Sequence, residues 1–364
     1  MAMAKAIRQS MVTSNEFFMV TQNQALSDKA IIKNQVEVLS LAEGFFQSSV
    51  LFALLRLEIF ERIGDGEKSV ETLAAELGAH PEILVRVLNA GVMLKLLETA
   101  DGRIYRVAGA CRSVLLPSAG QNYLGNWIRL MDEFSGALAK LDQAVLASGP
   151  TLDPEVYLGA DAERTRRYIL AMHNYASLRG KELAHYLDTS ACKSLLDLGC
   201  GSGTFAFHLG MKNPNLRLHL SDLPAVLEVT RTVQTKYYLQ NEVIYLPLDA
   251  AQDEIPGVYD LILVSNMIQC FDQPTRTKLL RRLHNALTAG GSLVVQAQYL
   301  QENRTGGRWA VYVDLNLLCT TQTGRNHTIE ETKRWLAETG FANIEYCPMS
   351  VYGTTSFVRG YKNP

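Results

Sequence analysis

The sequence predicts an α/β protein in which a mostly parallel sheet, covered by helices, follows a mainly helical N-terminal domain. Two observations support this fold class. From residue 194 onward, short apolar runs alternate with helical segments, as in "SLLDLG", "RLHLSDL" and "YDLILVSNM", which is typical of parallel sheets with helices on both faces. The first run leads into "DLGCGSG", residues 197–203. A glycine-rich turn between a strand and a helix lets a ligand approach the backbone closely.

The composition of the chain narrows the classes of partner that it is expected to bind. The 364 residues are enough for two domains, and 47% hydrophobic residues, 20% charged residues and a net charge of −2 describe an ordinary globular protein. This charge gives no electrostatic reason to expect nucleic-acid binding, so a small-molecule partner is favoured. The six cysteines lack CxxC pairs and histidines at metal spacing, which predicts reduced thiols and no metal site. No signal peptide or long uninterrupted apolar run is recognisable, so we expect a cytoplasmic protein without membrane contact.

The N-terminal part predicts helices followed by a winged helix. Residues 36–63 carry apolar residues at helical spacing with few polar breaks, so these helices are expected to be buried against something large, such as a second copy of the chain. Ser69 is a predicted N-cap, Gly78 ends the first helix and Pro81 opens the second. The strand-like residues 96–107 turn at Asp101 and Gly102, which predicts a hairpin wing.

DNA binding is the obvious alternative for a winged helix, and its charges argue against it. Residues 69–97 contain three glutamates against Arg86 and Lys95, so their net charge is −1. A helix that enters a DNA groove needs clustered lysine and arginine for the phosphates. We therefore favour packing or dimerisation over DNA binding; a salt-dependent mobility shift with random duplex would revive the alternative.

A turn-rich break at 147–160 predicts the domain boundary. We place a helical, winged-helix domain at 1–155 and a catalytic domain at 156–364, with one long linking helix over 161–188. The last residues, 344–362, predict two strands joined by a turn around Gly353. These strands are expected to add an antiparallel pair to the edge of the sheet.

The acids around the glycine turn indicate the cofactor. The dinucleotide fingerprint G-x-G-x-x-G would need a glycine at Thr204, whereas Asp197 precedes Gly199 by two residues and gives D-x-G-x-G-x-G. A carboxylate beside the turn disfavours a diphosphate and favours an ammonium group. S-adenosylmethionine has an α-amino group and no phosphate. Asp222 ends the next strand, in place to accept both ribose hydroxyls, and Asp249 ends the following strand, where it can face adenine.

With these residues assembled, the chain resembles the Rossmann-like class I S-adenosylmethionine-dependent methyltransferases. More narrowly, it resembles the small-molecule O-methyltransferases of the caffeate and acetylserotonin type, which have an N-terminal winged-helix dimerisation domain. Further segments that carry the resemblance are "SDLPAVLE", "VSNMIQCFD" and "TAGGSLVV". The resemblance implies a homodimer and S-adenosylhomocysteine as product. It implies these cofactor-binding residues: Asp197, Gly199, Gly201, Gly203, Asp222, Leu223, Asp249, Ala250 and Ser265.

The chain departs from this family at the catalytic position. The family's base is a histidine after "SN(I/V)L", and this chain has Gln269 there; an amide cannot accept a proton at neutral pH. Asn326 replaces an acid that assists in the family. Three hypotheses remain open. Gln269 positions an acceptor that is already ionised, such as a carboxylic acid or acidic enol; another group, His173, His327 or Asp272, is the base; or the scaffold performs a rearrangement or cyclisation instead of methyl transfer.

The predicted function is O-methylation of a hydroxyl, enol or carboxyl group of an apolar small molecule in specialised metabolism. The family places Met172 at the acceptor pocket. Trp127, Trp309 and Tyr312 are candidate aromatic walls, although each is also an ordinary core residue type. Asp314 either orients the acceptor or caps a local turn, and Asn326 completes the set of candidate acceptor-binding residues.

Overall fold

The C-terminal half contains a seven-stranded sheet in the order β6-β5-β4-β7-β8-β10-β9. The computed structural model describes residues 35–152, 161–349 and 355–364. The strands are β4 (Ser194–Leu198), β5 (Arg217–Asp222), β6 (Val243–Pro247), β7 (Tyr259–Ser265), β8 (Leu287–Ala297), β9 (Ala342–Pro348) and β10 (Ser356–Tyr361). Strands β4 to β8 are parallel, whereas β10 is antiparallel to both β8 and β9. This confirms the predicted sheet and its antiparallel edge; the predicted turn around Gly353 lies outside the described residues.

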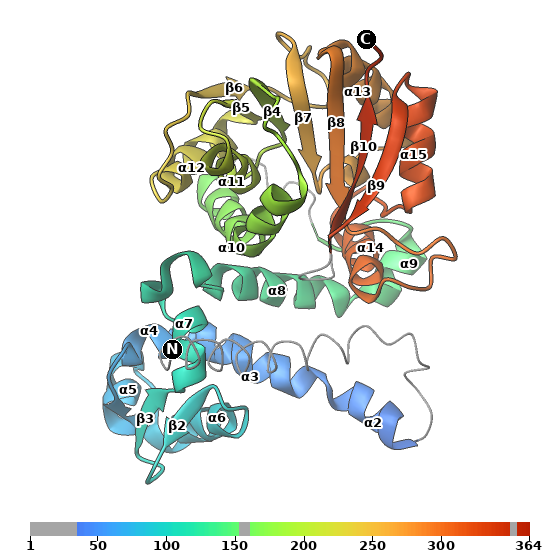
Figure 1. Cartoon of the computed structure of the whole chain (residues 1–364). Coiled ribbons are helices and arrows are strands. Elements are labelled where there is room, and N and C mark those ends of the chain that lie inside the picture. Colours follow the sequence, from blue (N-terminus) through green and yellow to red (C-terminus); the bar gives the residue numbers. More distant parts are fainter. Residues whose placement is uncertain (1–34, 153–160, 350–354) are drawn as a thin grey trace, which may run out of the picture.

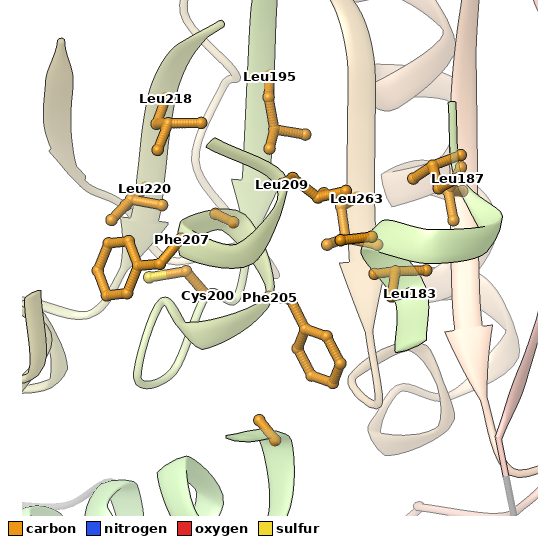
Figure 2. Packing of buried hydrophobic residues seen from close by; sticks show 14 of the residues in the cluster. Leu183, Leu187, Leu195, Cys200, Phe205, Phe207, Leu209, Leu218, Leu220 and Leu263 are labelled. Atoms are coloured by element: carbon orange, nitrogen blue, oxygen red, sulfur yellow. The ribbon is translucent and has the colours of Figure 1, made fainter. Parts of the chain in front are cut away.

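Helices cover both faces of the sheet, as the alternation of strands and helices predicts (Figure 1). One face is covered by α10 (Ala162–Tyr186), α11 (Thr204–Lys212) and α12 (Pro224–Gln234), and the other by α13 (Gln273–Asn285) and α15 (Ile329–Glu338). Each face has its own apolar core. Figure 2 shows Phe207 and Leu209 of α11 among leucines of β4, β5 and β7. Burial of these side chains provides the main driving force for this packing.

The strand order reverses between β4 and β7, because the chain proceeds from β4 to β5 and β6 on one side and to β7 and β8 on the other. Ligands bind at such a switch point, outside the carboxyl ends of the strands. In Figure 1 these ends point toward α8 (Gly125–Leu138), which lies between the sheet and the N-terminal helices. The glycine turn follows β4 directly and therefore lies at this point.

The predicted winged helix is present. It consists of α5 (Val70–Leu77), α6 (Pro81–Met93) and a small sheet of β1 (Lys68–Ser69), β3 (Ile104–Val107) and β2 (Leu97–Thr99). The Ser69 hydroxyl accepts the Thr72 N–H at 3.1 Å, which caps α5. Gly78 ends α5 with a φ of 64°, in the left-handed region that favours glycine.

The two halves meet along α8 and α10. Between the winged helix and α10 run α7 (Gly109–Leu115), η1 (Pro117–Asn122), α8 and α9 (Leu141–Ala147). Helix α8 contacts α10, α3 and also α14 (Arg308–Thr320) of the C-terminal half. Helix α10 begins at Ala162 and ends at Tyr186, close to the predicted 161–188, with Asp161 as its N-cap. The predicted boundary between residues 155 and 156 lies outside the described residues.

The first described helices leave much of their apolar surface exposed. They are α2 (Gln35–Glu43), α3 (Phe45–Arg56) and α4 (Ile59–Ile63), and α2 buries none of its residues within one chain. Exposed apolar side chains here are Val36, Val38, Leu39, Leu41, Phe45 and Phe46. By length and composition alone, the stretch Gln35–Arg56 is long and apolar enough to cross a membrane, with 11% of it buried. The second half of α3 and all of α4 pack into the core of the winged-helix domain, as the sequence predicts. The described part of the same chain provides no such surface for α2 and the start of α3.

Helix α12 ends at Gln234 in a tightened turn. The N–H groups of Lys236 and Tyr237 bond to carbonyls three residues back, at 3.0 and 2.9 Å. This tightening ends the helix and leaves Tyr237 buried beside α11.

Candidate active site

The glycine turn between β4 and α11 requires glycine for two separate reasons. Gly199, Gly201 and Gly203 have φ values of 68°, 53° and 70°, all in the left-handed region. A side chain at Gly199 would overlap the Met267 sulfur, and one at Gly203 would overlap the Phe207 ring. The first close approach brings the segment after β7 against the turn. The turn and the segment that carries Gln269 are therefore neighbours.

Asp222 is fixed against the turn at the end of β5. Its Oδ2 accepts the Gly201 N–H at 2.9 Å, and its Oδ1 accepts the Leu223 N–H at 2.8 Å. Burial raises the pKa of the Asp222 carboxyl to about 6, although these two N–H groups oppose the shift. The Thr230 hydroxyl also donates to the Gly201 carbonyl at 2.6 Å. The carboxylate is thus held in one orientation at the strand end where a ribose is predicted.

Asp197 is the most unusual carboxyl group in the site. It is 1% exposed, and neither of its oxygens makes a well-aligned hydrogen bond within the described residues. Burial, and next the charge of Asp222, raises its pKa to about 7. A buried carboxylate is costly without a positive partner. This arrangement fits a cofactor that brings an ammonium group to the end of β4.

The other predicted cofactor residues lie at the same edge of the sheet. After β6, the Asp249 carboxylate accepts the Ala251 N–H at 2.8 Å and the Gln252 side-chain amide at 2.9 Å. The Ala250 carbonyl accepts from Arg282 at 2.6 Å. Ser265 ends β7, where its hydroxyl donates to the Gln296 side chain. The structure therefore places the predicted residues of four strand ends close together. Their positions in the sequence, at the ends of successive strands, predict this arrangement.

Gln269 lies in η3 (Ile268–Cys270), next to the glycine turn, with 6% of its surface exposed. Its backbone carbonyl accepts the Arg325 N–H at 2.9 Å, which fixes the loop. Its side-chain Oε1 has no hydrogen-bond partner among the described residues. A buried amide oxygen without a partner is available to an acceptor group that donates or shares a hydrogen bond.

The three candidate bases have different surroundings. The Asp272 carboxylate accepts the Thr275 N–H at 2.9 Å and so caps α13 at an exposed position. His327 is 1% exposed, and its ring packs against Tyr299 and Trp335 with centroids at 5.3 and 5.0 Å. Burial lowers the pKa of His327 to about 3. His173 Nδ1 lies 2.9 Å from the Thr204 hydroxyl, at the start of α11. Within the described part of the chain, none of the three forms a hydrogen bond with Gln269 Oε1.

Two of the predicted aromatic walls pack together. The Trp127 ring lies 6.4 Å from that of Trp309 and 4.9 Å from that of Tyr175, between centroids. The Tyr175 hydroxyl accepts from the side-chain amide of Gln298, just after β8. Met172 is half-buried on the same helix as Tyr175. The sequence pattern predicts neither Tyr175 nor Gln298 as a site residue. The one signal for Gln298 is that glutamines alternate with apolar residues where an otherwise apolar strand ends.

The remaining predicted acceptor-binding residues lie on α14 and in the segment before α15. Tyr312 is 46% exposed on α14, where its hydroxyl accepts from Arg308 at 3.3 Å. Asp314 Oδ1 accepts the Asn326 N–H at 2.6 Å, and the Asn326 side-chain amide donates to the Ala310 carbonyl at 2.9 Å. Asp314 and Asn326 thus link α14 to the segment before α15. The Asp314 bond therefore spans twelve residues and caps no local turn, and the role of Asp314 toward an acceptor stays a prediction.

The sheet with its reversed β10 and the acidic glycine turn define a class I methyltransferase domain. Comparison with known proteins assigns this domain to a narrower family. Residues 149–342 match the family model for the O-methyltransferase domain, and residues 39–117 match that for the O-methyltransferase dimerisation domain. The chain belongs to the class I S-adenosylmethionine-dependent O-methyltransferases that carry an N-terminal dimerisation domain.

Individual relatives span nearly the whole chain. The tetracenomycin polyketide synthesis 8-O-methyl transferase of Streptomyces glaucescens is 28% identical over 88% of this chain and 95% of its own length. The 3-hydroxy-5-methyl-1-naphthoate 3-O-methyltransferase of Streptomyces sahachiroi is 24% identical over 88% and 94%. Human N-acetylserotonin methyltransferase, solved with S-adenosylmethionine, has the same fold, with a TM-score of 0.80 and 22% identity over 92% of this chain and all of that one. The predicted fold, methyltransferase class and cofactor are confirmed.

Proposed function

We propose that the protein methylates an acceptor oxygen that is ionised before it reaches Gln269. The observation that supports this proposal is the Gln269 side chain, buried next to the glycine turn, which cannot take a proton and whose amide N–H can donate a hydrogen bond to an anionic oxygen. A carboxylic acid with a pKa near ~4, or an acidic enol, needs no base at neutral pH, whereas a phenol near ~10 gains much more from one. Gln269 would hold such an acceptor in line for displacement.

The cofactor roles follow from the four strand ends. S-adenosylmethionine, when bound, supplies an activated methyl group. Asp197 and the three glycines would hold its methionine part, Asp222 and Leu223 its ribose, and Asp249 and Ala250 its adenine, with Ser265 beside them. The unpartnered Asp197 carboxylate supports the first assignment. The packed rings of Trp127, Tyr175 and Trp309 support an apolar or aromatic acceptor, and relatives act on a polyketide and a naphthoate.

A panel of acceptors tests the proposal. The purified protein is incubated with methyl-labelled S-adenosylmethionine and matched phenols, aromatic carboxylic acids and acidic enols, and methylated product and S-adenosylhomocysteine are measured by mass spectrometry. We expect turnover of acidic acceptors at least about a hundredfold faster than of phenols of the same ring system, the lower end of what a general base contributes. Phenol turnover that equals or exceeds that of the acids would contradict the proposal and indicate another base.

The same missing base supports a second candidate, which is a rearrangement or cyclisation on the methyltransferase scaffold. This candidate predicts firm binding of S-adenosylmethionine together with conversion of a substrate and no S-adenosylhomocysteine. The panel separates the two, because methyl transfer releases one S-adenosylhomocysteine for each product. Acceptor-dependent release of S-adenosylhomocysteine would rule this candidate out for the acceptor concerned.

We further propose that the protein is a homodimer in which the exposed apolar face of α2 and α3 meets a second chain. Phe45 and Phe46 are 60% and 61% exposed there, within the matched dimerisation domain. Replacing both with aspartate would place charges in the interface, and we expect the mass measured by light scattering to fall from two chains to one. The Ile83→Asp change, at a position 60% exposed on α6, is the control. A wild-type protein of one chain would contradict the proposal.

The cytoplasm is the proposed compartment. All six cysteines are free in the structure, which suits a reducing environment. Recovery of the native protein in a washed membrane fraction would contradict this proposal and would give the apolar stretch Gln35–Arg56 a different role.

A further inference from the structure

A chain of hydroxyl and imidazole groups links the middle of α10 to the glycine turn. His173 Nδ1 lies 2.9 Å from Thr204 Oγ1, and Thr204 Oγ1 lies 2.8 Å from Ser202 Oγ. Thr204 is the first residue of α11, directly after Gly203, and Ser202 lies between two of the three glycines. All three side chains are nearly fully buried, at 1%, 1% and 3% exposure. The chain therefore connects two distant segments where no water competes for the bonds.

The glycine turn depends on such external support. Its three glycines lose more conformational freedom on ordering than other residues and have no side chains that pack. Asp222 and Thr230 hold Gly201 through its N–H and its carbonyl, and these come from β5 and α12. The His173 chain reaches the turn from a third element, α10. Together the three contacts fix both ends of the segment from Gly201 to Thr204.

His173 is itself held rigidly. Its ring meets that of Tyr237 edge-on, with centroids 6.0 Å apart. Helices α10 and α11 approach closely at Gly180, where any side chain would overlap the His208 ring. Burial lowers the pKa of His173 to about 4, so the ring is neutral at physiological pH. A neutral, immobile imidazole suits the role of a fixed hydrogen-bond partner.

We propose that His173 is a positioning residue that holds the glycine turn in its cofactor-binding shape through Thr204 and Ser202. This role rests on the proposed function of the turn as the seat of the cofactor's methionine part. It differs from the role of a general base, because it uses Nδ1 to hold Thr204 and does not require Nε2, which has no partner among the described residues, to reach an acceptor. The residue acts on the cofactor through the turn, and it affects cofactor affinity rather than the protonation of the acceptor.

A double-mutant cycle tests this, with S-adenosylhomocysteine affinity measured by calorimetry and unfolding measured separately. His173→Leu and Thr204→Val each remove one side of the 2.9 Å contact, and each is expected to weaken binding about tenfold. The double variant is expected to bind no more weakly than either single variant, because both remove the same link. His173→Asn keeps a polar atom near the Nδ1 position, and Thr204→Ser keeps the hydroxyl, so both should bind within about threefold of wild type.

The control is His208→Leu. His208 is also buried against Tyr237, with centroids 5.3 Å apart, but its ring bonds to the Ser177 backbone on α10, whereas the His173 ring bonds to Thr204. The substitution should lower the melting temperature and leave S-adenosylhomocysteine affinity unchanged. Effects of His173→Leu and Thr204→Val that multiply in the double variant, or an equal loss of affinity in His208→Leu, would overturn the positioning role. Failure of the wild-type protein to bind S-adenosylhomocysteine would instead overturn the proposed function.

Discussion

Replacing Asp197 with asparagine is expected to abolish cofactor binding and, at the same time, to stabilise the cofactor-free protein. The carboxylate is 1% exposed, and the Ala206 N–H offsets only part of the effect of its burial, so its charge lacks a positive partner within the described chain. Loss of a charge-assisted contact to the cofactor's ammonium group should weaken S-adenosylhomocysteine binding by about a hundredfold or more, which corresponds to about 3 kcal/mol. Calorimetry of the two proteins at pH 8 measures this difference.

The gain in stability follows from the raised pKa. The pKa of Asp197 shifts from 3.8 to about 7 on folding, so the folded state disfavours the ionised form. The resulting stability is present at low pH and is lost as the pH rises from about 4 to about 7. Above pH 7 the cost is at most about 4 kcal/mol, at 1.36 kcal/mol per pKa unit. An asparagine side chain has no charge to bury, so we expect Asp197→Asn to melt a few degrees higher at pH 8 and nearly equally at pH 4.

The pH dependence of binding provides an independent check. Binding of a cationic cofactor requires ionised Asp197, so wild-type affinity should fall as the pH drops below about 7. The dependence steepens near pH 6, because Asp222 also has a raised pKa of about 6. Asp197→Asn should retain only the second step. A wild-type affinity that is constant from pH 8 to pH 5 would remove Asp197 from the ammonium site.

Asp260 is the matched control for this change. It stands at the start of β7, where it accepts the Lys193 and Ser194 N–H groups at 2.8 and 3.1 Å. Partial burial opposes ionisation, but these bonds outweigh it and hold the pKa of Asp260 below its usual value. Asp260→Asn is therefore expected to destabilise the protein at pH 8 and to leave cofactor affinity unchanged, which is the opposite pattern to Asp197→Asn.

The second large effect is expected from Gln269→His, which places a base beside the acceptor. An imidazole with an ordinary pKa near ~6.5 accepts the proton that the amide cannot. We expect phenol methylation to rise about a hundredfold, the low end of the range for a general base, with a rate that increases through the histidine pKa. The gain should stay near this end, because Asn326 supplies no carboxylate and its amide is committed to Ala310. Initial rates on matched phenols between pH 5 and pH 9 measure the effect.

Gln269→Leu separates positioning from proton transfer. It removes the hydrogen bonds of the amide without supplying a base, so turnover of acids and phenols should both fall. Turnover of carboxylic acids should not improve in Gln269→His, since these acceptors have no proton to lose at neutral pH. An unchanged phenol rate in Gln269→His, in a variant that still binds S-adenosylhomocysteine, would mean that another group already serves as the base.

The edge of the sheet where the cofactor is predicted to bind could be located from the sequence. Its position follows from the local hydrophobic pattern and from one rule of sheet topology. Asp197, Asp222 and Asp249 each end an apolar strand, and the carboxyl ends of parallel strands meet at one edge of a sheet. Whether such an acid faces a ligand or a backbone N–H is not encoded locally. Asp272 has the same chemistry, and the structure uses it as the N-cap of α13.

The acceptor side was less predictable because it depends on how helices are rotated against one another. Tyr312 and Trp309 stand three residues apart on α14, yet one is 46% exposed and the other packs against Trp127. Tyr175 and Gln298 meet across 123 residues of sequence. No periodicity in either segment specifies such a contact, since it is determined by packing between separate elements.

The sequence by itself determined the sheet, the winged helix and the cofactor, because hydrophobic periodicity, turn residues and the charge beside the glycines act over a few residues. The methyltransferase class followed from the resemblance of its motifs to a known family. Only the tertiary structure decided where the His173 ring lies, that Asp272 is a cap, and how much of α2 one chain leaves uncovered. These properties depend on which surfaces come together, and burial and hydrogen-bond partners exist only after the separate elements have packed.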